Sequence, residues 1–303
     1  MNTKEEIEEA LKIILNTKPV DTDKVIALST KLAQVDKSKI RFSVDAGVID
    51  RLGQELVARQ ETAVSELVKN SYDADATQVD LIYHNSDVVG GKLEIIDNGF
   101  GMDRNQLVNG FMRISSTDKI HNPKSERYNR KKAGQKGIGR FAVQRLGKKL
   151  TIITQTLQSE KALKLTINWD DYKGDIDLNS VTNKLEEVEK LREEGTTLII
   201  DTLRDRWTKA AVKRVYRYVS DILQPFSLTQ GKKVILEKNL KLDVNKGFTV
   251  SFFKQNGEKR ETIADNQSMI YDYALATISG YIDENGQGIY SLESKVLKIN
   301  EID

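Results

Sequence analysis

The sequence contains no cysteine and only two histidines, His84 and His121. The lack of cysteine excludes disulfides, thiolate metal sites and thiol nucleophiles, and it favours a cytoplasmic protein. With so few histidines, a histidine-rich metal site is not expected. No apolar run approaches the roughly 20 residues that cross a bilayer, and the acidic, helical N-terminal stretch does not resemble a signal peptide. We therefore expect a cytoplasmic protein with no membrane partner.

Length and composition describe a folded chain. The 303 residues are enough for one large domain or two smaller ones. Hydrophobic residues make up 39% and charged residues 30%, which is typical of globular and not of disordered proteins. Because 47 Lys and Arg face 45 Asp and Glu, the net charge of +2 gives no overall attraction to nucleic acid or membrane.

The chain begins with two stretches of helical spacing, 3–15 and 22–35, with a break at Pro19. This pattern predicts a helical hairpin, and we assign residues 1–37 to an N-terminal helical arm. An arm that packs on the main domain and an arm that binds a partner are both consistent with the pattern.

Helical and strand patterns alternate through the rest of the chain. Expected helices lie at 45–57, 63–73, 104–113 and 207–224, and expected strands at 41–44, 79–84, 92–97, 149–156, 163–169, 196–201, 233–238, 248–253 and 271–282. This order predicts an α+β fold, a two-layer α/β sandwich with a mixed, mostly antiparallel sheet and a small C-terminal β-rich segment.

One helix carries three polar residues at spacings of four and three: Glu66, Asn70 and Asp73. They share one helical face. Around a nucleotide, a carboxylate can orient and deprotonate a water, and an amide oxygen can bind magnesium. Taken alone, the pattern also fits a solvated polar face.

A strand ending in DNGFGM at 97–102 supplies the second motif. The Asp97 carboxylate at such a strand end can accept a hydrogen bond from an adenine amino group, and the glycines can let a flat base approach the backbone. An ordinary turn is the competing interpretation of this motif alone.

The third motif is GQKGIGRF at 134–141, where glycines lead into a helix. Backbone N–H groups at a helix start favour an anion. The motif is neither a dinucleotide fingerprint, since it follows a polar loop and not a strand, nor a P-loop. Further along, Thr196 begins a strand, where its hydroxyl can reach a bound base directly or through water.

These pieces, in this order, resemble the GHKL superfamily of ATPases, which includes DNA gyrase B, the large heat-shock chaperones, histidine kinases and MutL. ELVKNSYDADAT at 66–77 is similar to the family's N box, DNGFGM to its adenine box and GQKGIG to its phosphate-loop box. The resemblance covers about residues 40 to 225. It implies a Bergerat-type ATP-binding fold that binds ATP with Mg²⁺.

The resemblance also implies roles for individual residues. Glu66 becomes the general base, Asn70 the magnesium ligand and Asp97 the acceptor for the adenine amino group. The complete set of candidate nucleotide-binding residues is Asn70, Asp73, Asp97, Gly99, Gly101, Met102, Lys119, Gly134, Gln135, Lys136, Gly137, Ile138, Gly139, Arg140, Phe141 and Thr196.

Residues 104–133 correspond to the ATP lid. Within them SSTDK at 115–119 is similar to the lids of MutL and MORC proteins, which makes Lys119 a candidate phosphate contact; a surface lysine is the alternative. The other basic residues of the lid, Arg127 and Arg130 among them, are expected to serve the nucleotide's phosphates or solvent.

Glu66 favours the hydrolase branch, because histidine kinases keep the asparagine but do not use this glutamate. Within the superfamily the sequence resembles the ATPase domains of MutL, MORC and heat-shock chaperones most. This resemblance implies an ATPase that acts as an ATP-gated conformational and dimerisation switch, and an ATP-dependent homodimer of the full-length protein. A nucleotide sensor without significant hydrolysis is the alternative, and a histidine or serine protein kinase is less favoured. Nucleic acid enters only by family analogy.

We assign residues 38–228 to the ATP-binding domain and 229–303 to the start of a second, β-rich module. Because the sequence stops abruptly at Asn300-Glu-Ile-Asp303, we expect that it is a fragment of a longer protein and that this piece alone hydrolyses ATP slowly or not at all.

Overall fold

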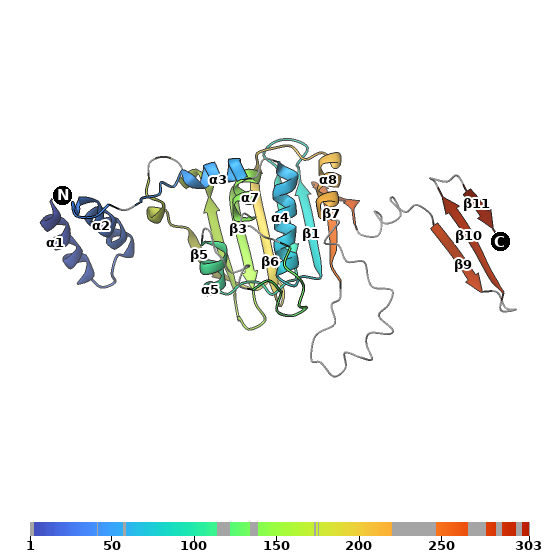
Figure 1. Cartoon of the computed structure of the whole chain (residues 1–303), viewed down its shortest axis with the longest axis horizontal. Coiled ribbons are helices and arrows are strands. Elements are labelled where there is room, and N and C mark those ends of the chain that lie inside the picture. Colours follow the sequence, from blue (N-terminus) through green and yellow to red (C-terminus); the bar gives the residue numbers. More distant parts are fainter. Residues whose placement is uncertain are drawn as a thin grey trace.

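The computed structural model describes residues 3–40, 42–56, 59–113, 122–133, 139–172, 174, 176–219, 247–265, 277–282, 287–294 and 299–302. Along the chain, the described elements form a helical hairpin, a central α/β body and a small three-stranded sheet (Figure 1).

The hairpin consists of α1 (Lys4–Leu15) and α2 (Thr22–Val35). Side chains cap both N-termini: the Thr3 hydroxyl accepts from the Glu6 N–H at 3.3 Å, and the Asp21 carboxylate accepts from the Lys24 N–H at 3.1 Å. The two helices expected from the sequence are therefore confirmed. The boundary of the arm at residue 37 stays a prediction.

The strand expected at 41–44 is wrong for residues 42–44, which form no strand. Their backbone has no strand beside it; the nearest pairing is the isolated bridge between Asp45 and Asp177. Phe42 is fully exposed. A local β-prone pattern does not make a strand when no neighbour is in reach.

The body is built on one eight-stranded sheet in the order β5-β4-β3-β6-β2-β1-β7-β8. All neighbours are antiparallel except β1 and β7, which are parallel. The strands are β1 (Gln78–His84), β2 (Lys92–Asp97), β3 (Gly147–Gln155), β4 (Ala162–Asn168), β5 (Lys184–Val188), β6 (Gly195–Leu203), β7 (Thr249–Asn256) and β8 (Lys259–Ala264). The mixed, mostly antiparallel sheet predicted from the sequence is confirmed.

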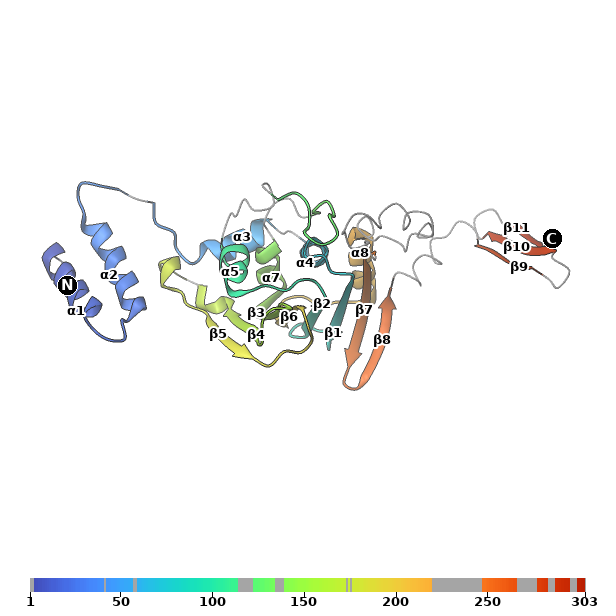
Figure 2. The ribbon, with the colours of Figure 1, turned by 90° about the horizontal axis from the view of Figure 1, so that it is seen from below.

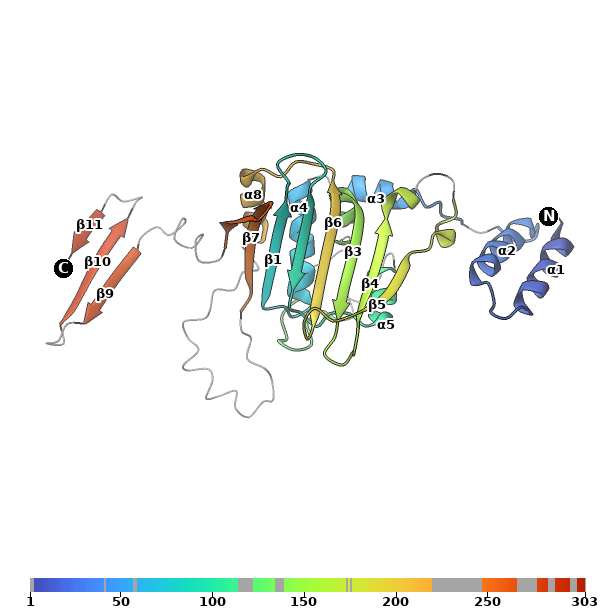
Figure 3. The same ribbon diagram turned by 180° about the vertical axis from the view of Figure 1, so that it is seen from behind.

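Helices cover one face of this sheet, and Figure 3 shows the opposite face without a helix over it. The covering helices are α3 (Val48–Leu56), α4 (Gln60–Asp73), α7 (Gly139–Leu146) and α8 (Lys209–Val219). Four shorter helical segments lie in the connections that follow β2 and β4: α5 (Arg104–Gln106), the π-helix η1 (Leu107–Phe111) and the 3-10 helices η2 (Trp169–Tyr172) and η3 (Leu178–Ser180). Figure 2 shows the two layers edge-on, which confirms the predicted sandwich.

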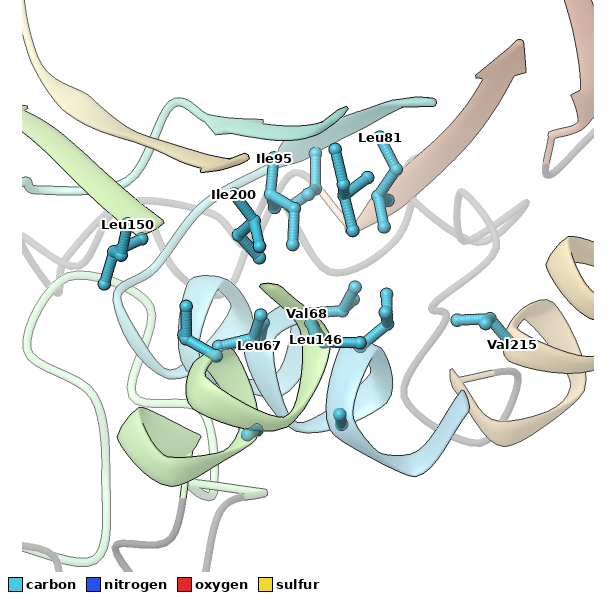
Figure 4. Packing of buried hydrophobic residues seen from close by; sticks show 14 of the residues in the cluster. Leu67, Val68, Leu81, Ile95, Leu146, Leu150, Ile200 and Val215 are labelled. Carbon is cyan, nitrogen blue, oxygen red and sulfur yellow. The ribbon is translucent and has the colours of Figure 1, made fainter. Parts of the chain in front are cut away.

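The core lies between the two layers (Figure 4). Leu67 and Val68 of α4 face Leu81 and Ile95 of the central strands, and each of the four is at most 1% exposed. At about 25 cal/mol per Å² of apolar surface removed from water, this layer is the main stabilising contribution to the fold. It also fixes how α4 is rotated, and therefore which of its side chains face away from the sheet.

The domain boundary at residue 229 stays a prediction, but two strands that we assigned to the second module join the main sheet. β7 pairs in parallel with β1, from Gln78 opposite Thr249 to His84 opposite Gln255, so residues 249–264 belong to the main sheet. Such a pairing joins segments far apart in the sequence, and strand periodicity alone does not reveal it. The separate sheet comprises β9 (Thr277–Ile282), β10 (Gly288–Ser294) and β11 (Ile299–Ile302). The strand expected at 233–238 lies outside the described residues.

Substitution of two neighbouring phenylalanines tests whether β7 is part of the main hydrophobic core. Phe252 is fully buried and packs on Tyr216 of α8, with ring centroids 6.2 Å apart, whereas Phe253 faces the other side and is only partly buried. Phe252→Ala should lower the free energy of unfolding of the main transition by about 3–5 kcal/mol. The control Phe253→Ala should cost about 1 kcal/mol. Urea unfolding measures both, and an unchanged main transition in Phe252→Ala would contradict this assignment.

Candidate functional site

The helix α4 presents Glu66, Asn70 and Asp73 on its partly exposed side, while Leu67 and Val68 point into the core. The Glu66 Oε1 accepts a hydrogen bond from Lys69 Nζ at 2.9 Å, and the two side chains are 22% and 26% exposed. The structure therefore brings the candidate base and the candidate magnesium ligand together, one helical turn apart.

Asp97 ends β2 and is 7% exposed. Its Oδ1 accepts from the Gly99 N–H at 3.0 Å and from the Thr196 N–H at 3.1 Å, and its Oδ2 accepts from the Ser71 hydroxyl at 3.0 Å. One carboxylate therefore joins β2, the start of β6 and α4. Because each carboxylate oxygen can accept two hydrogen bonds, Oδ2 keeps capacity for a further donor such as an adenine amino group.

Burial governs the ionisation of Asp97. Desolvation raises its pKa above the ordinary aspartate value, and the hydrogen bonds from Gly99, Thr196 and Ser71, together with the positive charge of Arg192, act in the opposite direction. The desolvation effect is the largest of these causes. A buried carboxylate whose pKa is shifted by opposing causes is typical of functional sites, and structural networks produce such shifts too.

The glycines of the DNGFGM motif have a packing role that the sequence did not suggest. Gly101 has φ +68°, and a Cβ there would lie 2.0 Å from the carbonyl oxygen of Gln155. A Cβ on Gly99 would lie 2.6 Å from the carbonyl oxygen of Ala74. The loop thus packs backbone against backbone, which only glycine permits. Approach of a base to these glycines stays a prediction.

Met102 and Thr196 lie near Asp97 and are connected through Thr154. The Met102 N–H donates to the Thr154 hydroxyl at 2.7 Å, and the Thr154 and Thr196 hydroxyl oxygens are 3.1 Å apart. Sequence reasoning missed Ser71 and Thr154. Ser71 had a usable signal, since it stands four residues after Leu67 and so on the buried face of α4; Thr154 had none, because its role depends on how β3 and β6 pair.

The described C-terminal part of the lid, residues 122–133, is fastened to the body. The Arg127 N–H donates to Asp75 Oδ2 at 2.8 Å, and the Arg127 guanidinium forms two hydrogen bonds with Glu194, at 2.8 and 3.1 Å. The Ala133 N–H donates to Asp73 Oδ1 at 2.6 Å. Asp73 therefore holds the lid, and its contact with nucleotide stays a prediction.

Arg130 is the most buried of the lid's basic residues, at 4% exposure. Its guanidinium donates to the carbonyl oxygens of Ala76 at 2.5 Å and Gly247 at 2.7 Å, and it lies over the rings of Tyr72 and Tyr128. The expectation that Arg127 and Arg130 serve phosphates or solvent is wrong, because fixed protein acceptors occupy both guanidinium groups.

Several candidate residues cannot be placed. Lys119 and the run Gly134, Gln135, Lys136, Gly137 and Ile138 lie outside the described residues. Gly139, Arg140 and Phe141 form the start of α7, so the glycine-rich run leads into a helix as expected. The phosphate contacts assigned to all these residues stay predictions.

Within the described ranges, no group of three or more His, Cys, Asp or Glu side chains is placed to hold a metal ion. Magnesium often takes one or two protein oxygens and completes its shell with phosphate oxygens and waters. The role of the Asn70 amide as such a ligand stays a prediction. In the same part of the chain, no helix is long and apolar enough to span a membrane.

Asp97→Asn tests the ionisation of the buried carboxylate. The amide oxygen can keep both N–H donors and its nitrogen can donate to Ser71, so the substitution removes charge and keeps the hydrogen bonds. Since the folded-state pKa of Asp97 is raised, Asp97→Asn should increase the free energy of unfolding at neutral pH. The gain should shrink as pH falls through that raised pKa and vanish below the aspartate pKa of the unfolded chain.

Urea unfolding at a series of pH values measures this effect. Asp201→Asn in β6, at a part-buried position, is the control for the same substitution elsewhere in the sheet. A gain for Asp97→Asn that persisted at the acid end would contradict the assignment to ionisation.

Arg130→Met tests the lid anchor. It leaves one buried and one part-buried carbonyl oxygen without their arginine donors, and the free energy of unfolding should fall by about 2–4 kcal/mol. Lys131→Met, at the exposed neighbouring position, is the control and should change stability by less than about 0.5 kcal/mol. Equal losses in the two variants would show that the arginine contacts do not hold the lid.

Comparison with known proteins agrees with this geometry. A family model described as histidine kinase-, DNA gyrase B-, and HSP90-like ATPase matches residues 58–196. The DNA mismatch repair protein MutL of Listeria monocytogenes is 37% identical over 68 residues, which is 22% of this chain and 11% of that protein. MutL of Lactiplantibacillus plantarum is 41% identical over 66 residues, 22% of this chain and 9% of that protein.

Among solved structures, the N-terminal domain of a DNA repair protein superposes with a TM-score of 0.44 at 17% identity, covering 83% of this chain and 73% of the other. The alignments with MutL reach only about a tenth of its length. The matched segment contains α4, the buried Asp97 and the glycine-rich entry to α7. Residues 58–196 therefore belong to the GHKL superfamily of histidine kinase-, DNA gyrase B- and HSP90-like ATPases, and they carry an ATP-binding module.

Proposed function

We propose that this chain is a magnesium-dependent ATPase that uses ATP to switch its conformation and its association with a second copy. The observation that carries the proposal is that α4 carries two of the three candidate groups and holds the third by a hydrogen bond. Glu66 and Asn70 lie one turn apart on its open side, and Ser71, next to Asn70, donates to the buried Asp97. One rigid helix thus fixes the candidate base, metal ligand and adenine acceptor relative to one another.

In this proposal Asp97 Oδ2 accepts a hydrogen bond from the adenine amino group, with Gly101, Met102 and Thr196 around the base. The backbone N–H groups of the run 134–139 hold the phosphates at the start of α7, where the helix dipole favours negative charge. The ordered network around Asp97 supports this part, because a fixed acceptor loses little freedom when ATP binds.

Hydrolysis is assigned to Glu66. Its carboxylate takes a proton from a water while the water oxygen bonds to the terminal phosphorus, the bond from that phosphorus to the bridging oxygen breaks, and ADP leaves. Magnesium, held through Asn70, supplies charge neutralisation on the phosphates when bound. The partly buried position of Glu66 supports this role, since it limits competing solvent.

The switch and the homodimer are further parts of the proposal. ATP that contacts both the body and the lid binds the closed form better than the open form, and that difference in affinity shifts the population. The matched relatives are DNA mismatch repair proteins. A role of this chain on nucleic acid has no support beyond that analogy.

Glu66→Gln should bind ATP with an affinity within about threefold of the wild type, and its turnover should fall by at least about 100-fold. The variant keeps the side-chain shape and removes the base. Calorimetry with ATP and magnesium measures binding, and phosphate release measures turnover. Glu160→Gln, on an exposed loop, is the control. Turnover of Glu66→Gln at the wild-type rate would exclude Glu66 as the base.

The ion pair between Glu66 and Lys69 favours one second candidate, an ATP-binding sensor without significant hydrolysis. The Lys69 ammonium group occupies the Glu66 Oε1 at 2.9 Å, and a water that approaches this oxygen has to displace it. Single-turnover measurement separates the two candidates: ATP bound at equilibrium with no phosphate released would support the sensor and reject the ATPase.

A further inference from the structure

We propose that Arg192 is a positioning residue for adenine binding: from the loop between β5 and β6 it places a positive charge beside Asp97, so that this buried carboxylate stays available as a hydrogen-bond acceptor. The inference rests on the proposed function, because it assigns Asp97 to the adenine amino group. Arg192 itself acts through Asp97.

The loop that carries Arg192 is fixed on both sides. Before it, Lys190 Nζ donates to the carbonyl oxygen of Thr156 at 2.8 Å, and the Leu191 N–H donates to Gln155 Oε1 at 3.3 Å. After it, Glu194 forms an ion pair with Arg127 of the lid at 2.8 Å. Arg192 therefore occupies a defined place and is not a freely moving surface arginine.

The guanidinium folds back onto the strand pair that ends at Asp97. Its Nη2 donates to the Thr197 hydroxyl at 2.8 Å, and Thr197 is paired with Ile96, the residue before Asp97. Gly195, with φ +125°, makes room: a Cβ there would lie 2.8 Å from Arg192 Nε and 2.2 Å from the Asp97 carbonyl oxygen. The guanidinium is thus packed against the backbone next to the aspartate.

The positive charge of Arg192 affects the ionisation of the Asp97 carboxylate. The groups that contact the Asp97 carboxylate are uncharged: the Ser71 hydroxyl from α4, the Thr196 N–H from β6 and the Gly99 N–H from the following loop. The positive charge of Arg192 lowers the Asp97 pKa against the effect of burial. In turn, desolvation lowers the pKa of the half-buried Arg192 and the Asp97 charge opposes this.

One hydrogen-bond donor of Arg192 is left over. The buried Nε has no hydrogen-bond partner among the described residues. A buried N–H group without a hydrogen-bond partner costs free energy, and a smaller polar residue would satisfy Thr197. The presence of an arginine here therefore points to its positive charge as the useful property. Arg192 also lines a surface depression of about 540 Å³, together with Leu157, Lys190, Leu191 and Glu193. A shorter neutral side chain can therefore be tolerated there.

The experiment measures ATP affinity of the full chain, with magnesium, between about pH 6 and about pH 8. Arg192→Gln should bind ATP about tenfold more weakly than the wild type at the acid end, because a protonated Asp97 is a weaker acceptor for the amino group. The loss of affinity should be much smaller at the alkaline end. Arg192→Lys, which keeps the charge, should restore most of the affinity. The control Arg206→Gln, at an exposed position, should follow the wild type.

A second readout does not depend on nucleotide. Carbon NMR of aspartate-labelled, nucleotide-free protein follows the titration of Asp97, whose signal is identified by its loss in Asp97→Asn. The midpoint should move to higher pH in Arg192→Gln and not in Arg206→Gln. If Arg192→Gln does not fold, Thr197→Val, which removes the hydroxyl that holds Nη2, should move the midpoint in the same direction by less.

The outcomes separate the two proposals. A pH-independent loss of affinity in Arg192→Gln, or an unmoved Asp97 midpoint, overturns the role of Arg192 and leaves the proposed ATPase intact. A wild-type chain that binds no ATP overturns the proposed function, while a shifted midpoint would still establish the electrostatic link between Arg192 and Asp97.

Discussion

The site depends on one buried carboxylate. Asp97 receives hydrogen bonds from α4, from β6 and from its own loop, so it aligns the helical layer with the sheet at the point where the candidate adenine site begins. Burying a charge is costly, and the three neutral donors and the nearby Arg192 offset only part of this cost, since the pKa of Asp97 stays raised. The same arrangement that stabilises the carboxylate leaves it able to accept one more donor, which links the stability of the fold to its ability to bind a ligand.

A second set of contacts fixes the described C-terminal part of the lid, residues 122–133, to the body. Asp73 and Asp75 at the end of α4 accept backbone N–H groups of the lid, and Arg130 joins the lid to Gly247, just before β7. The helix that presents Glu66 and Asn70 is therefore connected at its C-terminal end to the lid and to the start of the parallel strand. A change in the nucleotide site has a direct physical route, through packed and hydrogen-bonded groups, to the C-terminal part of the chain.

The parallel pairing of β1 with β7 has a comparable effect on architecture. It adds two strands at one edge of the sheet and provides the apolar surface on which α8 packs through Phe252 and Tyr216. The ATP-binding body therefore extends past the point where the sequence pattern indicated a new module. Loop-closure entropy opposes such long-range pairing, and the buried side chains of β7 provide the compensating burial.

The sequence by itself determined the local features: the helix with Glu66 and Asn70, the strand that ends at Asp97, the glycine-rich entry to α7 and the two-layer class of the fold. These follow from side-chain periodicity and from turn and helix-start residues, which act over a few positions. Only the tertiary structure decided that Ser71 and Thr154 complete the site, that Arg127 and Arg130 anchor the lid, that Gly101 is needed for backbone packing, and that Arg192 lies beside Asp97. Each of these depends on which distant segments meet, and a single sequence does not encode that in any local pattern.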